Sequence, residues 1–143
     1  MVERGWVVVT GASSGIGEAF AQRMAAHHPV LAVARREQPL AAMAEKTPNI
    51  HVCAADIATV QGIEAIVDGL AGERIQYLVH NAGVLSPIGP LLEQDPADIR
   101  YALAVNLEAP IALTRSLLPQ MVSGGRILHI SSGGAHSPYS GWG

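Results

Sequence analysis

The sequence predicts an α/β protein built around a doubly wound parallel β-sheet. Short apolar runs alternate along the chain with segments whose apolar residues recur at helical spacing, and this alternation is typical of parallel strands joined by helices. Hydrophobic residues make up 49% of the chain and charged residues only 15%, as expected where helices cover both faces of a sheet. The length of 143 residues suits one domain, 1–143, with a core of its own.

The predicted elements follow one another in a regular order. The strands are expected at residues 6–9, 30–34, 50–54, 75–80 and 126–130, and the helices at 16–24, 38–46, 60–70 and 97–121. Right-handed crossovers between these strands give the order 3-2-1-4-5 in the sheet. A loop rich in glycine and proline follows the fourth strand at 83–90, and residues 131–143 are expected to form another loop.

The last predicted helix, at 97–121, is the longest. Its apolar residues are expected to form one buried stripe, made of Ile99, Leu103, Leu107, Leu117 and Met121. Gly124 and Gly125 follow this stripe and are expected to end the helix before the fifth strand begins.

Charge, cysteine content and histidine spacing exclude several classes of function. The net charge is −3 and the 9 basic residues are scattered, so no nucleic-acid partner is expected. No apolar run is long enough to span a membrane. The single Cys53 cannot form an internal disulfide, which favours the reducing cytoplasm. The 6 histidines show no metal-ligand spacing, so no metal site is expected.

A glycine-rich turn lies between the first predicted strand and the first predicted helix. It runs Thr10-Gly11-Ala12-Ser13-Ser14-Gly15-Ile16-Gly17. The glycines permit a tight turn at Gly11, the close approach of a pyrophosphate at Gly15 and close packing of the helix at Gly17. The free N–H groups at the start of the helix attract phosphate. The turn is therefore predicted to bind a dinucleotide, and a glycine turn without a ligand is the alternative.

Two motifs together resemble the classical short-chain dehydrogenase/reductase family. The glycine turn has the spacing G-x3-G-x-G, and Asn81-Ala82-Gly83 follows the fourth predicted strand. The resemblance implies a Rossmann fold that binds NAD(P) and commonly forms homodimers or homotetramers. It places Asn81 in the middle of the sheet, near the adenosine ribose, and Asp56 beside the adenine ring. By position alone, Asp56 is equally well an N-cap of the next helix.

The second predicted strand ends in two arginines. An NAD site usually has an acidic residue here, which binds the ribose 2′-hydroxyl, but the sequence has Arg35 and Arg36 and no acid before Glu37. A guanidinium can bind a 2′-phosphate through two parallel hydrogen bonds. Arg35 therefore predicts NADP as the cofactor in preference to NAD, and a solvated pair of loop arginines is the alternative.

Two polar positions are predicted to be catalytic. Asn106 falls beside the expected buried stripe, and Pro110, four residues later, has no N–H to donate to its carbonyl. The resemblance gives this Asn the role of holding a water of the proton relay; a simple proline kink is the alternative. Ser132, after the fifth strand, matches the family's catalytic Ser, which polarises a substrate carbonyl. Ser131 has nearly the same position, and a turn-forming serine pair is the alternative.

The family's proton-donating Tyr and its activating Lys, in the pattern Tyr-x-x-x-Lys, do not occur where the resemblance requires them. The Tyr is expected about thirteen positions after Ser132, which lies beyond Gly143, and Tyr139 has the wrong spacing. Lys46 is the only lysine and lies in an early helix. The chain is therefore expected to be a Rossmann domain truncated before these two residues, and to be inactive alone.

These observations predict an NADP-dependent carbonyl reductase or alcohol dehydrogenase that acts on a small molecule. Residues 131–135, with Pro138 and Trp142, are similar to sepiapterin-reductase-like and benzil-reductase-like members, and this resemblance implies a diketone or bicyclic carbonyl substrate. A sensor that binds the dinucleotide without catalysis and a shortened interaction module are the alternatives. Asn106 and Ser132 favour the enzyme, because a sensor needs no proton relay.

Overall fold

The computed structural model describes residues 4–137 and 139–140 and contains one five-stranded parallel sheet. Strands β1 (Trp6–Thr10), β2 (Val30–Ala34), β3 (Ile50–Ala54), β4 (Ile75–His80) and β5 (Met121–His129) lie in the order β3-β2-β1-β4-β5. Every neighbouring pair is parallel, so the predicted doubly wound sheet and its strand order are confirmed. Pro138 and Trp142, which contribute to the resemblance to sepiapterin- and benzil-reductase-like members, lie outside the described residues.

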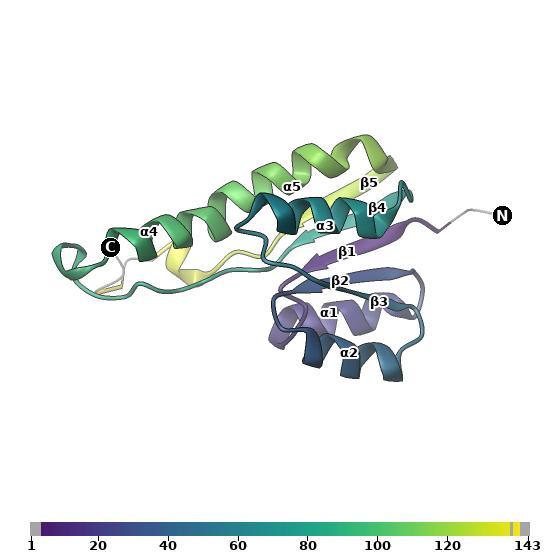
Figure 1. Cartoon of the computed structure of the whole chain (residues 1–143), viewed down its shortest axis with the longest axis horizontal. Coiled ribbons are helices and arrows are strands. Elements are labelled where there is room, and N and C mark those ends of the chain that lie inside the picture. The colour runs from purple at the N-terminus through teal and green to yellow at the C-terminus, as the bar shows by residue number, and fades with distance from the viewer. Residues whose placement is uncertain (1–3, 138, 141–143) are drawn as a thin grey trace.

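Helices cover both faces of the sheet (Figure 1). On one face lie α1 (Gly15–Ala25) and α2 (Glu37–Lys46), and on the other lie α3 (Val60–Leu70), α4 (Pro96–Leu103) and α5 (Ala109–Leu117). Successive residues of β1 point to opposite faces: Val7 and Val9 pack on the α1 side, and Val8 packs on the α3 side. All three are fully buried, so the strands are held between two apolar layers. Within the described part of the chain, no helix is both long and apolar enough to cross a membrane.

The predicted helix at 97–121 is shorter and less regular than expected. α4 passes into a π-helical segment (Ala104–Glu108), and α5 then ends at Leu117. A 3₁₀ turn (Leu118–Gln120) leads directly into β5, which begins at Met121. Gly124 and Gly125 therefore lie inside a strand, and the prediction that they end the helix is wrong.

These two glycines instead accommodate an irregularity in β5. Gly124 has a φ of +77°, and the register between β4 and β5 shifts between Ile75 and Tyr77. A Cβ at Gly125 would lie 2.9 Å from Met121 Cε. Glycines that permit a bulge in a strand look the same in a sequence as glycines that stop a helix.

The buried face of the long helix also differs from the prediction. Leu103 and Leu107 are 49% and 55% exposed, whereas the buried positions are Val105, Ala109, Leu113 and Leu117. The π-helical segment places an extra residue in one turn and so rotates the face that meets the sheet. Of the expected stripe, Leu117 is buried in the helix, and Met121 packs on the same core from β5.

Candidate active site

A cleft of about 380 Å³ opens at the carboxyl end of the sheet. All of the predicted cofactor-binding residues except Gly15 and Gly17 line this cleft. Its opposite wall includes Tyr101 and Val105 of the long helix. Ligands of doubly wound sheets bind at this edge. The cleft therefore lies where the sequence analysis predicts the cofactor to bind.

The glycine turn between β1 and α1 is shaped by its glycines. Gly11 and Gly15 have φ values of +66° and +59°, in the left-handed region that favours glycine. A Cβ at Gly11 would lie 2.8 Å from Ala82 Cα, and a Cβ at Gly17 would overlap Gly11 O. At Gly15 a Cβ would have no neighbour within 4 Å, so the turn is open there. The turn is thus tight at Gly11, open to a ligand at Gly15 and closely packed at Gly17.

Thr10 connects the glycine turn to the loop at 81–83. Its buried hydroxyl accepts hydrogen bonds from the N–H groups of Asn81 and Ala82, both at 3.1 Å. The Asn81 amide donates in turn to the carbonyls of Thr10 and Gly11, also at 3.1 Å. Asn81 therefore joins the ends of β1 and β4 in the middle of the sheet. Thr10 is the first residue of the glycine-rich turn in the sequence, but no role in the site is predicted for it from the sequence.

The two arginines after β2 contact opposite sides of the cleft. Arg35 Nη1 donates to Tyr101 Oη at 2.7 Å, and its guanidinium carbon lies 5.9 Å from the centre of the Tyr101 ring. Arg36 Nη2 donates to Ser13 Oγ at 3.1 Å and to Ser14 Oγ at 3.5 Å. These acceptors are hydroxyls, and neither guanidinium has a carboxylate partner among the described residues. At the end of β2 the cleft therefore carries two positive charges that, in the described part of the chain, are bonded only to hydroxyl groups.

Asp56 follows β3 and lines the cleft. Its Oδ1 accepts a hydrogen bond from Ala58 N at 2.9 Å, which closes a local turn. The alternative interpretation as the N-cap of α3 is wrong, because Thr59 occupies that position and its Oγ1 accepts from Gly62 N at 3.0 Å. The other carboxylate oxygen of Asp56 has no protein partner in the described part of the chain.

Asn106 lies in the π-helical segment and binds the loop that follows β4. Its Oδ1 accepts from Val84 N at 2.9 Å, and its Nδ2 donates to Val84 O at 2.8 Å. The side chain is exposed, although the sequence places Asn106 beside the expected buried stripe, and both of its polar atoms have partners. The helix is irregular here, as the missing N–H of Pro110 predicts, and Ala109 N donates to Ala104 O, five residues back.

Ser132 follows β5 and is not among the residues that line the cleft. Its Oγ accepts a hydrogen bond from Gly134 N at 3.2 Å and so caps a 3₁₀ turn (Gly133–Ala135). The turn-forming interpretation therefore describes the contact that this serine makes. Because the hydroxyl acts only as an acceptor in this contact, its proton remains available to donate.

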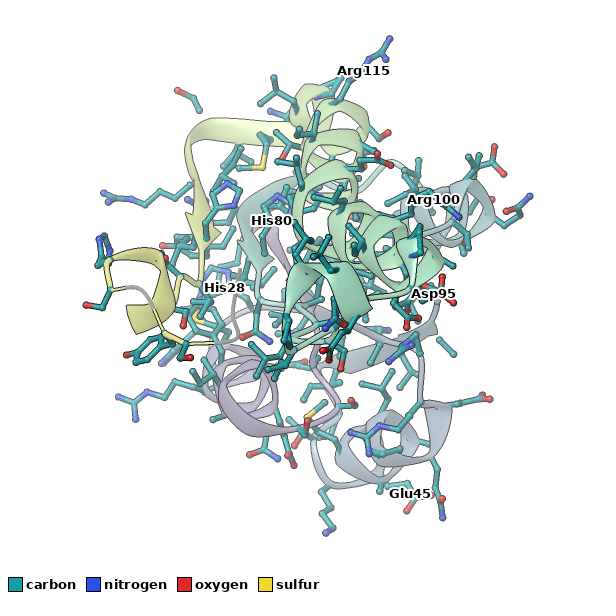
Figure 2. All side chains as sticks on the ribbon, turned by 90° about the vertical axis from the view of Figure 1, so that its left-hand side faces the viewer. His28, Glu45, His80, Asp95, Arg100 and Arg115 are labelled. Carbon is teal, nitrogen blue, oxygen red and sulfur yellow. The ribbon has the colours of Figure 1, made fainter. Side chains whose placement is uncertain are left out.

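His80 is a buried histidine at the end of β4, beside the long helix (Figure 2). Its Nε2 lies 2.8 Å from Thr114 Oγ1, and its ring stacks on that of His129 with centres 4.7 Å apart. Burial, followed by the nearby His129, lowers the pKa of His80 to about 4, so the ring is neutral at neutral pH. Among the described residues, no group of three or more His, Cys, Asp or Glu side chains could hold a metal ion.

The chain is similar to known proteins over nearly its whole length. A family model described as short chain dehydrogenase matches residues 5–143. Sulfoacetaldehyde reductase 2 of Chromohalobacter salexigens is 30% identical over 144 residues, which cover 94% of this chain and 57% of that protein. Benzil reductase ((S)-benzoin forming) of Bacillus cereus is 29% identical over 150 residues, which cover 96% of this chain and 60% of that protein.

A solved structure shares the fold. A metagenomic short-chain oxidoreductase in complex with NADP matches with a TM-score of 0.85 and 35% identity, over 95% of this chain and 66% of that one. The chain spans 57% and 60% of the two curated relatives, so it corresponds to little more than half of their length. Because the family model matches residues 5–143, the chain belongs to the short-chain dehydrogenase family.

Proposed function

We propose that the protein is an NADP-dependent oxidoreductase that transfers a hydride between nicotinamide and a ketone or secondary alcohol. The cofactor choice depends on one observation: the guanidinium groups of Arg35 and Arg36, at the end of β2, bond only hydroxyl groups among the described residues. An NAD site has an acid at this point, whereas the 2′-phosphate of NADP supplies the negative charge that these arginines lack. The relative whose structure contains NADP supports the same choice.

The residues of the cleft fit a dinucleotide. Ser14, which precedes α1, makes no side-chain cap hydrogen bond, so the first N–H groups of the helix remain for the pyrophosphate. Gly15 leaves open space beside them. Asp56 and the loop at 81–83 line the same cleft and are assigned to the adenosine half. The proposal therefore needs no rearrangement of the sheet or of the glycine turn.

The chemistry is assigned to the end of β5 and to the π-helical segment. When bound, the nicotinamide supplies or accepts the hydride. Ser132 donates a hydrogen bond to the substrate oxygen, where negative charge develops during reduction. The carbonyl of Asn106 holds a water of the proton relay, because Pro110 cannot donate to it. The proposal assigns the remaining proton-transfer steps to the Tyr and Lys that the family resemblance implies.

The substrate is proposed to be a small carbonyl compound, and a diketone is the first to test. The similarity to a benzil reductase supports this choice, as does the run at 131–135. A non-catalytic dinucleotide sensor is the competing function, and it predicts cofactor binding without turnover. The single Cys53 favours a reducing compartment, so a cytoplasmic enzyme is proposed.

The outer face of the long helix supports a homodimer or homotetramer. Four large apolar side chains have 49–61% of their surface exposed: Leu103, Leu107 and Ile111 of the helix, and Leu118 of the 3₁₀ turn that follows it. Exposed large apolar side chains gathered in one segment are typical of an interaction site, and a second copy of the same segment would bury them symmetrically.

The test of this function uses the full-length protein, NADPH and a reactive diketone, with loss of NADPH as the signal. Ser132→Ala should lower kcat by roughly 10²–10³-fold, the usual effect of removing one donor to a developing oxyanion. Ser131→Ala is the matched control and should keep the wild-type kcat. Tight NADPH binding without turnover by the wild-type protein would favour the sensor, and equal losses in both variants would contradict the assignment of Ser132.

A further inference from the structure

We propose that Tyr101 is a positioning residue that strengthens the preference of the cleft for a 2′-phosphate by holding the guanidinium of Arg35. This inference rests on the proposed NADP dependence and deepens it. The two residues are 66 positions apart in the sequence and come from opposite sides of the cleft, after β2 and in α4. No motif spacing singles out Tyr101, so only the folded chain shows the pair.

The contact between the two side chains has two separate parts. Arg35 Nη1 donates a hydrogen bond of 2.7 Å to Tyr101 Oη, and the guanidinium carbon lies 5.9 Å from the ring centre, within the range of a cation–π contact. A guanidinium has five N–H donors in one plane, so this bond leaves most of them for a phosphate. Because the acceptor is a hydroxyl and not a carboxylate, Tyr101 orients the positive charge without cancelling it.

The helix segment that bears Tyr101 is fixed by contacts on both sides of this residue. Asp95 caps the start of α4, where its carboxylate accepts from the second residue of the helix at 2.8 Å (Figure 2). One turn after Tyr101, Val105 is buried and lines the same cleft. The next residue, Asn106, makes two hydrogen bonds to Val84. The segment that bears the tyrosine ring is therefore hydrogen-bonded to a loop that lines the cleft.

Tyr101 is expected to increase the affinity for the ligand because it restricts the Arg35 side chain before the ligand binds. Arg35 is exposed, and a free arginine side chain loses much rotational freedom when a ligand fixes it. A contact that already restricts the side chain in the folded protein removes part of that cost from binding. Arg36 is restricted in the same way by Ser13. The gain applies only to a ligand that binds the guanidinium through a 2′-phosphate, so NAD should gain nothing from Tyr101.

The test measures binding, not turnover, on the full-length protein. Tyr101→Phe keeps the ring beside the guanidinium and removes only the hydroxyl. Calorimetric titrations with NADP and with adenosine 2′,5′-bisphosphate should show Kd values raised roughly threefold to tenfold, the effect of one net hydrogen bond. The Kd for NAD should stay at its wild-type value, and this also reports that the variant is folded. In an Arg35→Ala background, Tyr101→Phe should have no further effect.

Arg35→Ala separates failure of this inference from failure of the proposed function. If Arg35→Ala leaves a ratio that favours NADP unchanged, the preference does not depend on Arg35, and this inference fails while the proposed NADP dependence stands. If the wild-type protein itself binds NADP no more tightly than NAD, the proposed NADP dependence fails and the inference fails with it. If Arg35→Ala removes the preference but Tyr101→Phe does not weaken NADP, only the role of Tyr101 is wrong. The inference is also overturned if Tyr101→Phe weakens NADP and NAD equally. Tighter NADP binding by Tyr101→Phe would overturn it too, since the contact would then compete with the phosphate.

Discussion

Asn106 pairs with both backbone groups of Val84, accepting from its N–H at 2.9 Å and donating to its carbonyl at 2.8 Å. One side chain thus provides hydrogen-bond partners for both backbone groups of a loop residue, as a neighbouring strand does in a sheet. Because Asn106 lies in the π-helical segment, the irregular part of the helix and the loop beside the cleft are parts of one arrangement. A change that makes the helix regular should therefore affect the cleft.

Pro110→Ala makes that change. Alanine supplies an N–H four residues after Asn106, so the regular helical hydrogen bond can form and occupy the carbonyl assigned to the relay water. We expect kcat of the full-length protein to fall by at least about tenfold, as is common when a proton-transfer group is impaired. Pro119→Ala, in the 3₁₀ turn before β5, is the control and should keep the wild-type kcat. An unchanged kcat in Pro110→Ala, with an unchanged melting temperature, would exclude this role for the Asn106 carbonyl.

Gly17→Ala should destabilise the fold. The added Cβ would overlap Gly11 O and the Asn81 amide, which are bonded to each other and cannot both move away. We expect the free energy of unfolding to fall by about 1–3 kcal/mol, the usual cost of overpacking. Gly69→Ala in α3 meets only Leu31 methyl groups at 3.8 Å and should raise stability by about 0.5–1 kcal/mol. Urea unfolding of the two variants checks the prediction, and equal stabilities would contradict it.

His80 should make stability depend on pH. Its folded pKa of about 4 lies below the ordinary value of 6.5, so the unfolded chain binds the additional proton first. The stability gained by keeping His80 neutral is complete above about pH 6.5 and is lost as the pH falls towards about 4, by roughly 3 kcal/mol in all. His80→Gln retains a polar group near Thr114 but does not titrate. The wild-type free energy of unfolding should therefore fall more steeply than that of the variant between pH 7 and pH 5, and parallel curves would show that His80 is not responsible.

Leu107→Glu should dissociate the proposed oligomer. The substitution places a charge among the exposed apolar side chains of the long helix, where a second copy would bury it without a partner. Ser116→Glu adds the same charge to the same helix at an exposed position outside this group and should leave the oligomer intact. Light scattering after size-exclusion chromatography measures both. A wild-type protein that is monomeric, or a Leu107→Glu variant with unchanged mass, would rule out this surface as the interface.

Most of the fold could be predicted from local sequence patterns. The first four strands and the glycine turn are bounded by turn residues, which makes them recognisable in the sequence. Right-handed crossovers between parallel strands then give the observed strand order. The phase of the long helix was predicted wrongly, because the π-helical segment changes which side chains are buried and large leucines were assumed to face the core. The role of Gly124 depends on pairing with a strand that lies far away in the sequence, which periodicity does not reveal.

The candidate site was predicted only in part for a similar reason. Residues that directly follow strands, such as Arg35 and Asn81, could be predicted from the sequence, because the carboxyl ends of parallel strands meet at one edge of the sheet and ligands bind there. Tyr101 and Val84 enter the site only through contacts between segments that are distant in the sequence. Such contacts depend on the exact path of the long helix over the cleft.

The affinities for NADP and NAD decide whether the arginines at the end of β2 select the cofactor. In calorimetric titrations of the full-length protein, NADP should bind more tightly than NAD by tenfold to somewhat over a hundredfold, which corresponds to about 1.5–3 kcal/mol for a charged hydrogen bond. Arg35→Asp removes one of the two charges and restores the acid that NAD sites have, so it should reverse the preference. Equal affinities for NADP and NAD, in both the wild-type protein and Arg35→Asp, would contradict the proposed NADP dependence.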